Sequence, residues 1–285
     1  MNLRVVQFLP NNDAHAFDEV AEMLVASLAD LGHDVEFGIN EPSTSRLNIL
    51  LGCNLLRPSA ALFRYDYIAF QSEQLFEGSP WWGLGNLQPI LQRAKMVWDY
   101  SPANIEFLAG KGIPAAHLPI GYHPVLRKIR KAVSMEHDVL FYGSRNERRN
   151  TILAGISSLP SQPVVTALFG AYGKQRDAQI ASARINLNIH YYEAKVFEAV
   201  RVSYLLNNGA FTISESSPAY PWPGVDLPMA DALDIPNLCR MYLEDENERN
   251  RVAALCREQF ADLYPMTKLV EGALSGATVQ ACDAA

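Results

Sequence analysis

Arginine residues follow a glycine at the end of an apolar run in the middle of this chain. The run 138–142 leads into Gly143, and the polar turn after it contains Arg145, Arg148 and Arg149. A guanidinium group can bind a phosphate through two parallel hydrogen bonds, and the first turn of a helix attracts anions. A strand, a glycine, a basic turn and a helix in this order therefore predict a site for a phosphate or a diphosphate.

Polar side chains also gather where a predicted strand over 184–190 meets a predicted helix over 194–207. They are His190, Tyr191, Tyr192, Glu193, Lys195 and Glu198. In a Rossmann-like half, this junction belongs to the rim that faces a ligand. A carboxylate such as that of Glu198 can accept hydrogen bonds from a pair of hydroxyl groups, and it is also favoured near a helix N-terminus. Tyr172 and Arg176 lie on the same predicted rim, where they could stack on a base or bind a phosphate.

Two successive alternations of strands and helices position these residues. In the first half, the predicted strands cover 3–9, 34–39, 47–51, 65–71, 95–99 and 115–118, with one helix between the first two and another from Ser101 to Gly110. In the second half, the predicted order is strand 138–142, helix 147–158, strand 163–169, helix 174–182, strand 184–190, helix 194–207 and strand 210–214. Further helices are predicted over 236–243, 245–263 and 266–281. Such alternation favours parallel sheets covered by helices.

The chain loses this periodicity between His117 and His137, where prolines and a basic run occur. We therefore predict a domain boundary in this segment. The expected parts are an N-terminal Rossmann-like domain over 1–120, a linker over 121–137, a C-terminal Rossmann-like domain over 138–265, and a last helix over 266–285 that packs back on the N-terminal domain.

The net charge of −7 is unevenly distributed. Residues 1–126 contain 7 Lys and Arg against 13 Asp and Glu, residues 127–201 contain 12 against 6, and residues 202–285 contain 5 against 12. A chain this acidic is a poor candidate for binding nucleic acid, because that affinity comes mostly from Lys and Arg. The basic middle block suits one small anionic ligand, although the cations of 127–131 also fit a solvated connecting segment.

The composition is that of a soluble globular protein, with 49% hydrophobic residues in a chain of 285. No run approaches the roughly 18 to 20 apolar residues that span a membrane, and the N-terminus shows no signal-peptide pattern, so we expect a cytoplasmic protein. Cys53, Cys239, Cys256 and Cys282 are widely spaced and form no metal-binding pattern.

Neither half has a G-x-G-x-x-G motif after its first strand, which disfavours a NAD-dependent dehydrogenase. Three segments, 138–149, 185–193 and 196–209, instead resemble the donor-binding half of bacterial GT-B glycosyltransferases. The resemblance implies an α/β fold in which two Rossmann-like domains face a cleft, followed by C-terminal helices. It also implies a nucleoside diphosphate sugar as donor, with no cofactor and no bound metal, because basic side chains and helix dipoles neutralise the leaving diphosphate.

The resemblance further implies roles for individual residues. Gly143, Ser144 and Arg145 would border the donor's diphosphate, and Glu198 would hold the ribose hydroxyls. The other residues expected to bind the donor are Arg149, Tyr172, His190, Tyr192, Glu193 and Lys195. Many retaining members carry two glutamates eight residues apart, whereas Glu193 and Glu198 are five apart. The stereochemistry of transfer therefore stays open.

An inverting member needs a base, which usually lies on a loop of the N-terminal half. Asp13 and His15 follow the first predicted strand there. An imidazole titrates near neutral pH, and a nearby carboxylate can orient it to take a hydroxyl proton. Glu73 is the alternative base or a contact to the acceptor. Trp81 and Trp82 could stack on an acceptor sugar or cover an edge of the core.

The sequence thus predicts a hexosyltransferase-like enzyme that moves a sugar to a hydroxyl group of a glycan, a lipid-linked glycan or a small metabolite. No nucleic-acid partner is expected, and no membrane association is evident. Two alternatives stay open: a nucleotide-sugar epimerase of the same fold, and a non-catalytic protein that binds a nucleotide or a glycan. In the leading hypothesis, Arg145→Ala and Glu198→Ala each weaken donor binding and leave the fold intact.

Overall fold

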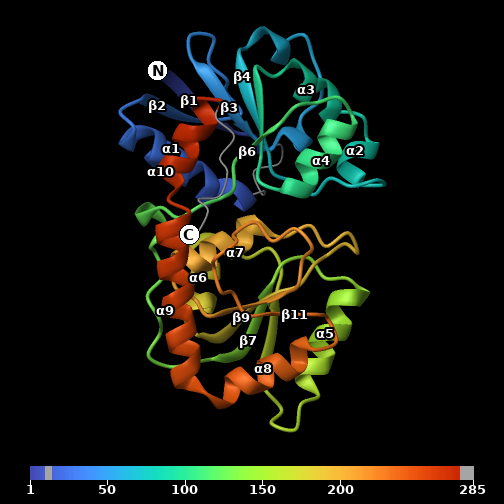
Figure 1. The fold of residues 1–285 in the computed structure, drawn as a ribbon, viewed down its shortest axis with the longest axis vertical. Helices are drawn as coiled ribbons and strands as arrows, with labels where there is room; N and C mark the ends of the chain where they lie inside the picture. The colour runs from blue at the N-terminus through green and yellow to red at the C-terminus, as the bar shows by residue number, and fades with distance from the viewer. Residues whose placement is uncertain (10–14, 277–285) are drawn as a thin grey trace. The chain divides into compact units, whose positions relative to one another are not determined.

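The computed structural model describes residues 1–9 and 15–276 of the chain. These residues fold into two compact units (Figure 1). Unit 1 comprises Met1–Val125 together with the chain from Tyr264 onward, and unit 2 comprises Leu126–Leu263. Each unit is built on one parallel sheet, as expected for a chain in which strands and helices alternate.

Unit 1 contains a six-stranded parallel sheet in the order β2-β1-β3-β4-β5-β6. The strands are β1 (Asn2–Gln7), β2 (Asp34–Ile39), β3 (Leu47–Leu51), β4 (Tyr67–Gln71), β5 (Met96–Asp99) and β6 (Ala116–His117). β3 and β4 are almost continuous runs of buried residues, which is typical of central strands covered on both faces. All six strands lie where the sequence predicts them, with ends that differ by at most two residues.

The helices of unit 1 include one that comes from the far end of the described chain. α1 (Asp18–Asp30) links β1 to β2 and buries Val20, Leu24 and Leu28, which the 3.6-residue period places on its inner face. α10 (Met266–Leu274) packs against α1 (Figure 1). The remaining helices are α2 (Pro80–Gly83), α3 (Leu87–Arg93), α4 (Pro102–Gly110) and the short 3-10 helices His15–Phe17, Cys53–Leu55, Leu62–Arg64 and Pro124–Leu126.

A short parallel bridge between Tyr122 and Pro265 brings the chain back to unit 1. The Tyr122 amide donates to the Tyr264 carbonyl at 2.8 Å, and the Met266 amide donates to the Tyr122 carbonyl at 2.8 Å. Only glycine fits at Gly121, because a Cβ there would lie 2.3 Å from the Tyr264 carbonyl oxygen. The start of α10 is thus fixed to the segment that leaves the unit 1 sheet.

Unit 2 contains a five-stranded parallel sheet in the order β11-β10-β9-β7-β8. The strands are β7 (His137–Tyr142), β8 (Val165–Leu168), β9 (Ala183–Asn188), β10 (Thr212–Glu215) and β11 (Met229–Ala230). The helices are α5 (Glu147–Ser157), α6 (Gly173–Ala181), α7 (Ala199–Asn207), α8 (Ile235–Glu244) and α9 (Glu246–Leu263). Except for β11, every one of these elements overlaps a predicted one.

α7 begins later than the sequence predicts. The helix was expected from about residue 194, but it starts at Ala199. Lys195 has a left-handed φ of 48°, which no helix residue adopts. Phe197 is buried in an aromatic cluster, with its ring centroid 5.3 Å from that of Tyr220 and 5.4 Å from that of Trp222. Packing against a distant loop therefore keeps residues 195–198 out of the helix.

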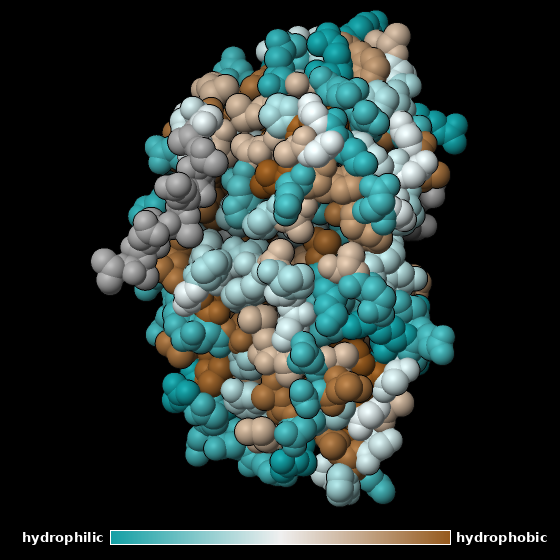
Figure 2. All heavy atoms as spheres, turned by 45° about the vertical axis from the view of Figure 1, so that its right-hand side comes forward, coloured by the Kyte–Doolittle hydropathy of each residue, from teal (hydrophilic) through white to brown (hydrophobic). Residues whose placement is uncertain are grey.

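Surface hydrophobic side chains lie in groups separated by hydrophilic ones on the face that Figure 2 shows. Among the described residues, no helix is both long enough and apolar enough to cross a membrane. Cys53, Cys239 and Cys256 are buried free thiols, whereas Cys282 lies outside the described residues.

Candidate functional site

Charged side chains of unit 2 gather at the carboxyl end of its sheet. β7, β9 and β10 are neighbouring parallel strands, so their carboxyl ends lie along one edge. Loops from this edge lead into the N-termini of α5 and α7, where the helix dipole favours negative charge. The ionisable side chains at this edge form what we call the rim cluster: Arg148, Arg149, His190, Lys195, Glu198, Arg201 and Glu215.

Gly143 makes the turn between β7 and α5. Its φ of 141° favours glycine, and a Cβ there would lie 2.6 Å from Nη2 of Arg201. Asn146 caps α5, because its Oδ1 accepts a hydrogen bond from the Arg149 amide at 2.9 Å. The Nδ2 of the same side chain donates to the Tyr191 carbonyl at 2.8 Å. The basic turn is therefore fixed to the loop that follows β9.

Glu198 lies at the centre of the rim cluster. Its Oε2 accepts hydrogen bonds from His190 Nδ1 at 2.7 Å and from Asn188 Nδ2 at 3.3 Å. Its Oε1 accepts from the Tyr191 amide at 3.2 Å and from Arg149 Nη2 at 3.3 Å. Burial would raise the pKa of this carboxyl group, but the hydrogen bond from His190 and the nearby cations hold its pKa below the usual value. Glu198 is thus a negative charge held by four protein donors.

Arg149 and Arg201 place two guanidinium groups next to this one carboxylate. Arg149 is buried and donates to the Ile189 carbonyl at 3.0 and 2.6 Å and to the Ser144 carbonyl at 2.7 Å. The guanidinium carbons of Arg149 and Arg201 lie 5.1 and 5.5 Å from the ring centroid of Phe141. Burial and the positive charge of Arg201 lower the pKa of Arg149 to about 10, so it stays charged at neutral pH. The pair therefore carries more positive charge than Glu198 balances.

Glu215 ends β10 and is fully buried. It forms an ion pair with Arg148, whose Nη1 donates to Oε2 at 2.7 Å, and Lys195 Nζ lies 3.4 Å from Oε1. The His190 amide donates to Oε2 at 3.1 Å, and Arg148 Nε also lies 3.1 Å from Glu193. Burial would raise the pKa of Glu215, but the hydrogen bonds from Arg148 and from the His190 amide, together with the nearby positive charge, lower the pKa below its usual value. This buried ion pair fixes α5 to the ends of β9 and β10.

Sequence reasoning did not select Arg201 and Glu215 as site residues. Arg201 lies three residues after Glu198 at the start of α7, and that spacing places two side chains on the same face of a helix. The signal for Arg201 was therefore present in the sequence. Glu215 follows a predicted strand, but its pairing with Arg148 crosses the sheet and has no local signature.

Arg145 and Ser144 are exposed on the turn before α5. Arg145 Nε donates to Asn150 Oδ1 at 2.7 Å, and it makes no contact with the rim cluster in the described part of the chain. The sequence predicted a clamp on the diphosphate at Arg145. Arg149, which the sequence also predicted to bind the donor, belongs to the cluster together with Arg148.

Tyr172 and Arg176 belong to the start of α6. Tyr172 precedes the helix and is 37% exposed. Arg176 is buried, with its guanidinium carbon 4.3 Å from the ring centroid of Tyr204 and Nη2 2.9 Å from Asp177. The charge of Arg176 therefore serves the packing of α6 against α7, and the phosphate role considered for it has no support in this geometry.

An open pocket of about 540 Å³ lies beside the rim cluster. It is lined by Asn146, Glu147, Arg148, Thr151, Tyr191, Tyr192 and Glu193. The rings of Tyr191 and Tyr192 meet edge to face, with centroids 4.9 Å apart. This volume lies in the range of small-molecule sites, and its lining combines aromatic faces with a guanidinium group.

His15 and Asp18 form a pair at the carboxyl end of β1 in unit 1. His15 Nδ1 lies 2.8 Å from Asp18 Oδ2, and Gln7 Nε2 donates to Asp18 Oδ1 at 2.7 Å. Asp13, the partner expected for His15, lies outside the described residues. Asp18 is thus one carboxylate that contacts this imidazole, which is half-exposed.

Glu73 follows β4 in a loop held by amide side chains. Gln71 accepts from the Glu73 amide at 2.8 Å and donates to its carbonyl at 2.8 Å, and Asn104 donates to the same carbonyl at 2.7 Å. The carboxyl group accepts from Asn54 Nδ2 at 3.2 Å. Burial raises the pKa of Glu73 to about 7. A carboxyl group that titrates near neutral pH can serve as a general base.

We expect Glu73→Gln to remove a pH dependence of stability from the protein. Because the pKa is about 7 in the folded state and 4.5 ordinarily, the unfolded chain releases this proton first as the pH rises. The free energy of unfolding should therefore fall between pH 4.5 and 7, by on the order of 1 kcal/mol per pH unit. Urea denaturation at several pH values measures this slope. The exposed Glu106→Gln is the control, and an unchanged slope in Glu73→Gln would contradict the assignment.

Trp81 and Trp82 cover an edge of the unit 1 core. Both pack against a buried cluster that includes Leu87 and Leu91, and Trp82 meets Phe107 edge to face with ring centroids 5.2 Å apart. Of the two roles considered for this segment, the geometry favours packing over acceptor stacking.

No family model matches this chain. It is 31% identical over 140 residues to an uncharacterized protein of Acanthamoeba polyphaga mimivirus, over 48% of this chain and 47% of that protein. A second uncharacterized protein of the same virus is 24% identical over 168 residues, over 57% of this chain and 22% of that protein. The chain thus spans about half or less of the length of these curated relatives. They are viral, whereas the sequence resemblance pointed to bacterial proteins.

Solved structures match nearly the whole chain. An alpha-glucosyltransferase in complex with UDP and a DNA 13-mer containing a HMU base matches with a TM-score of 0.64 and 8% identity, over 96% of this chain and 99% of that one. The T4 phage BGT with its UDP-glucose substrate has a TM-score of 0.57 and 11% identity, over 98% and 100%. AviGT4, a glycosyltransferase involved in avilamycin A biosynthesis, has a TM-score of 0.55 and 15% identity, over 96% and 99%. The α/β GT-B fold that the sequence predicts is therefore confirmed.

Proposed function

We propose that this chain is a glycosyltransferase that takes a sugar from a nucleoside diphosphate donor, whose diphosphate binds at the rim cluster. The observation that carries this proposal is a pair of guanidinium groups beside the Gly143 turn: Arg149 contacts the Glu198 carboxylate, and the charge of Arg201 helps to lower the pKa of that carboxylate. An anion at this place would balance the excess positive charge. The shared fold with glucosyltransferases bound to UDP or UDP-glucose supports the same assignment.

The chemistry of sugar transfer explains the arrangement. Negative charge grows on the diphosphate as its bond to the sugar breaks, and preorganised positive groups stabilise that charge. Arg149, Arg201 and the N-termini of α5 and α7 supply such groups. We propose that the reaction needs no metal ion, because these groups neutralise the leaving diphosphate.

Glu198 also has a place in the proposed donor site. Its contact with His190 is short, at 2.7 Å, whereas its other three contacts are 3.2 to 3.3 Å long. Ribose hydroxyls could replace the long contacts while His190 keeps the carboxylate in place. Tyr192 and Glu193 line the adjacent pocket, where the remainder of the donor would lie.

We propose Glu73 as the base that takes the proton from the acceptor hydroxyl, with the His15–Asp18 pair as its competitor. Glu73 is favoured because burial brings its pKa to about 7. Turnover measured in Glu73→Gln and in His15→Ala decides between them, since only loss of the base should abolish transfer while donor binding persists.

The acceptor we propose is a hydroxyl group of a glycan, a lipid-linked glycan or a small metabolite. One matching glucosyltransferase was solved with DNA, but this chain has a net charge of −7, which opposes binding to a phosphate backbone. Transfer assays with DNA containing a HMU base and with neutral glycans test this choice directly. Transfer to the DNA would overturn it.

A nucleotide screen tests the function itself. We expect UDP or a UDP-sugar to raise the melting temperature selectively over GDP, CDP and dTDP, because a ligand that binds the folded state stabilises it. Incubation with the sugar donor alone then separates the alternatives. An epimerase converts the donor without an acceptor, and a non-catalytic protein binds it without turnover. If none of the nucleotides raises the melting temperature, the donor site is refuted.

A further inference from the structure

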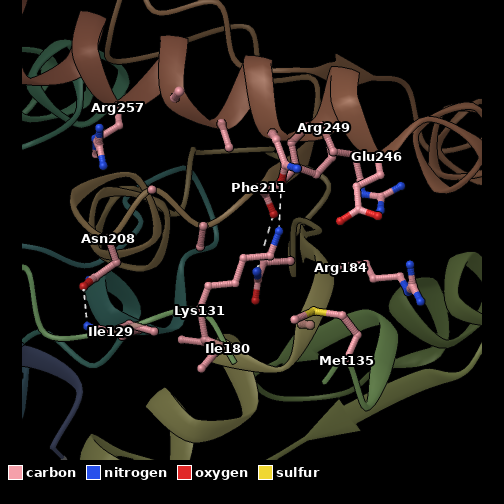
Figure 3. Close-up of a pocket in the computed structure, with 18 residues that line it drawn as sticks. Ile129, Lys131, Met135, Ile180, Arg184, Asn208, Phe211, Glu246, Arg249 and Arg257 are labelled. Atoms are coloured by element: carbon pink, nitrogen blue, oxygen red, sulfur yellow. Dashed lines mark hydrogen bonds between the residues drawn. The ribbon is translucent and has the colours of Figure 1, made fainter. Parts of the chain in front are cut away.

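A second cavity lies in unit 2, away from the rim cluster. It measures about 180 Å³ and opens at the amino end of the sheet, where β9 begins and α7 ends (Figure 3). Its walls come from five places: the segment 129–135 before β7, the end of α6, the start of β9, the residues 208–211 between α7 and β10, and one side of α9. The donor site and this cavity therefore lie at opposite ends of the same strands.

The lining of this cavity has an excess of positive charge. Lys131, Arg184, Arg249 and Arg257 line it, against one carboxylate, Glu246. Arg184 pairs with Asp138 outside the cavity at 3.1 Å. The remaining three cations have no carboxylate within 4.0 Å in the described part of the chain.

Lys131 and Arg257 are the cations best placed to meet a ligand. Figure 3 shows them extending from opposite walls, Arg257 from α9 and Lys131 from the segment before β7. Lys131 Nζ donates to Asn250 at 2.9 Å, which leaves two of its hydrogens. Arg257 makes neither a hydrogen bond nor an ion pair with the residues that the structure describes. Its guanidinium group therefore keeps its full capacity to donate.

Arg249 shows that the charge excess has an energetic cost. Its side chain is buried and donates to the carbonyl oxygens of Tyr242 and Leu243. Burial and the charge of Arg184 lower the pKa of Arg249. An anion in the cavity would relieve this repulsion, so binding it would stabilise unit 2.

The apolar part of the lining limits the ligand's size and character. Ile129, Ile180 and Phe211 face the cavity together with small residues of α9. A cavity of about 150 Å³ holds a molecule the size of benzene. The volume of 180 Å³ thus admits a phosphate group with a short organic body, but not a nucleotide.

We propose that this cavity binds a small phosphate monoester, with the phosphate between Lys131 and Arg257 and the organic body against Ile180 and Phe211. A phosphate dianion is favoured over a carboxylate because it offers three terminal oxygens and two negative charges to cations that approach from separate elements. The proposal does not depend on the function of the rim cluster.

Calorimetric titration of the whole chain with glycerol 3-phosphate, inorganic phosphate and glycerol tests this site. We expect glycerol 3-phosphate to bind at least as tightly as inorganic phosphate, and glycerol not to bind. Arg257→Gln and Lys131→Gln should each weaken phosphate binding about tenfold or more, which is the usual effect of losing a charged hydrogen bond. Both side chains are at least partly exposed, so neither substitution should unfold the chain.

Two controls make the result decisive. Arg251→Gln removes a cation of the same helix that pairs with Glu248 and does not line the cavity, so it should leave binding unchanged. Arg201→Gln removes a cation of the rim cluster and reports any phosphate that binds there instead of in the cavity. Binding that is lost in Arg201→Gln but kept in Arg257→Gln and Lys131→Gln would place the phosphate at the donor site and refute the proposal. If inorganic phosphate binds and glycerol 3-phosphate does not, the assignment of a phosphate monoester as ligand is refuted.

Discussion

Glu198→Ala is expected to lower the free energy of unfolding by about 3 to 5 kcal/mol, the usual cost of removing one partner from a buried charge pair. The substitution leaves Arg149 and His190 without the carboxylate that they share inside unit 2. Sequence reasoning expected this variant to keep its fold. The burial of the carboxylate and its four donors change that expectation.

Urea denaturation measures the loss, and Glu193→Ala is the matched control. The Glu193 side chain is 83% exposed and pairs with Arg148 only at the surface, so its removal should cost less than about 1 kcal/mol. Equal stability of the two variants would show that Glu198 is not a buried anchor. Donor binding should be measured at a temperature where Glu198→Ala remains folded, so that stability and affinity are separated.

Arg201→Gln is expected to weaken the binding of UDP by about 10- to 100-fold, because a lost charged hydrogen bond costs about 1.5 to 3 kcal/mol. Arg201 is half-buried, its Nη1 donates to Asn188 at 2.7 Å, and glutamine keeps the polarity and the aliphatic part of the side chain. The fold should therefore persist, and titration calorimetry reports the affinity.

Arg145→Gln is the control for this experiment and decides between two assignments. Arg145 is exposed and forms a hydrogen bond with Asn150. Contacts of exposed charged side chains contribute little free energy, so we expect this substitution to change UDP affinity by less than about threefold. The opposite pattern, with binding lost in Arg145→Gln and kept in Arg201→Gln, would support the site inferred from sequence and refute the rim cluster as the diphosphate site.

The fold of unit 2 was largely predictable because its signals are local. The apolar run of β7, the turn at Gly143 and the cap at Asn146 act within a few residues, and α5 begins at the predicted Glu147. The start of α7 was not predictable in this way. Phe197 is held by rings that lie more than twenty residues further along the chain, and no local pattern reports such packing.

The candidate site was predicted only in part for a similar reason. Three arginines follow Gly143, and a sequence gives each of them equal weight. The start of α5 separates them, because Arg148 and Arg149 turn with the helix toward the end of β9, whereas Arg145 precedes the helix and faces solvent. Glu215 could be recognised as a site residue only from the sheet order, in which β10 lies beside β9.

Unit 1 is completed only after unit 2 has been synthesised, because its last helix follows unit 2 in the chain. α10 buries Met266, Leu269 and Val270 and packs on α1, yet all of unit 2 must be synthesised before α10 emerges. The face of α1 that α10 covers therefore stays open during elongation, when exposed apolar surface invites aggregation. Unit 2 lies in the sequence between two parts of unit 1, and a fragment of residues 1–125 would therefore lack α10.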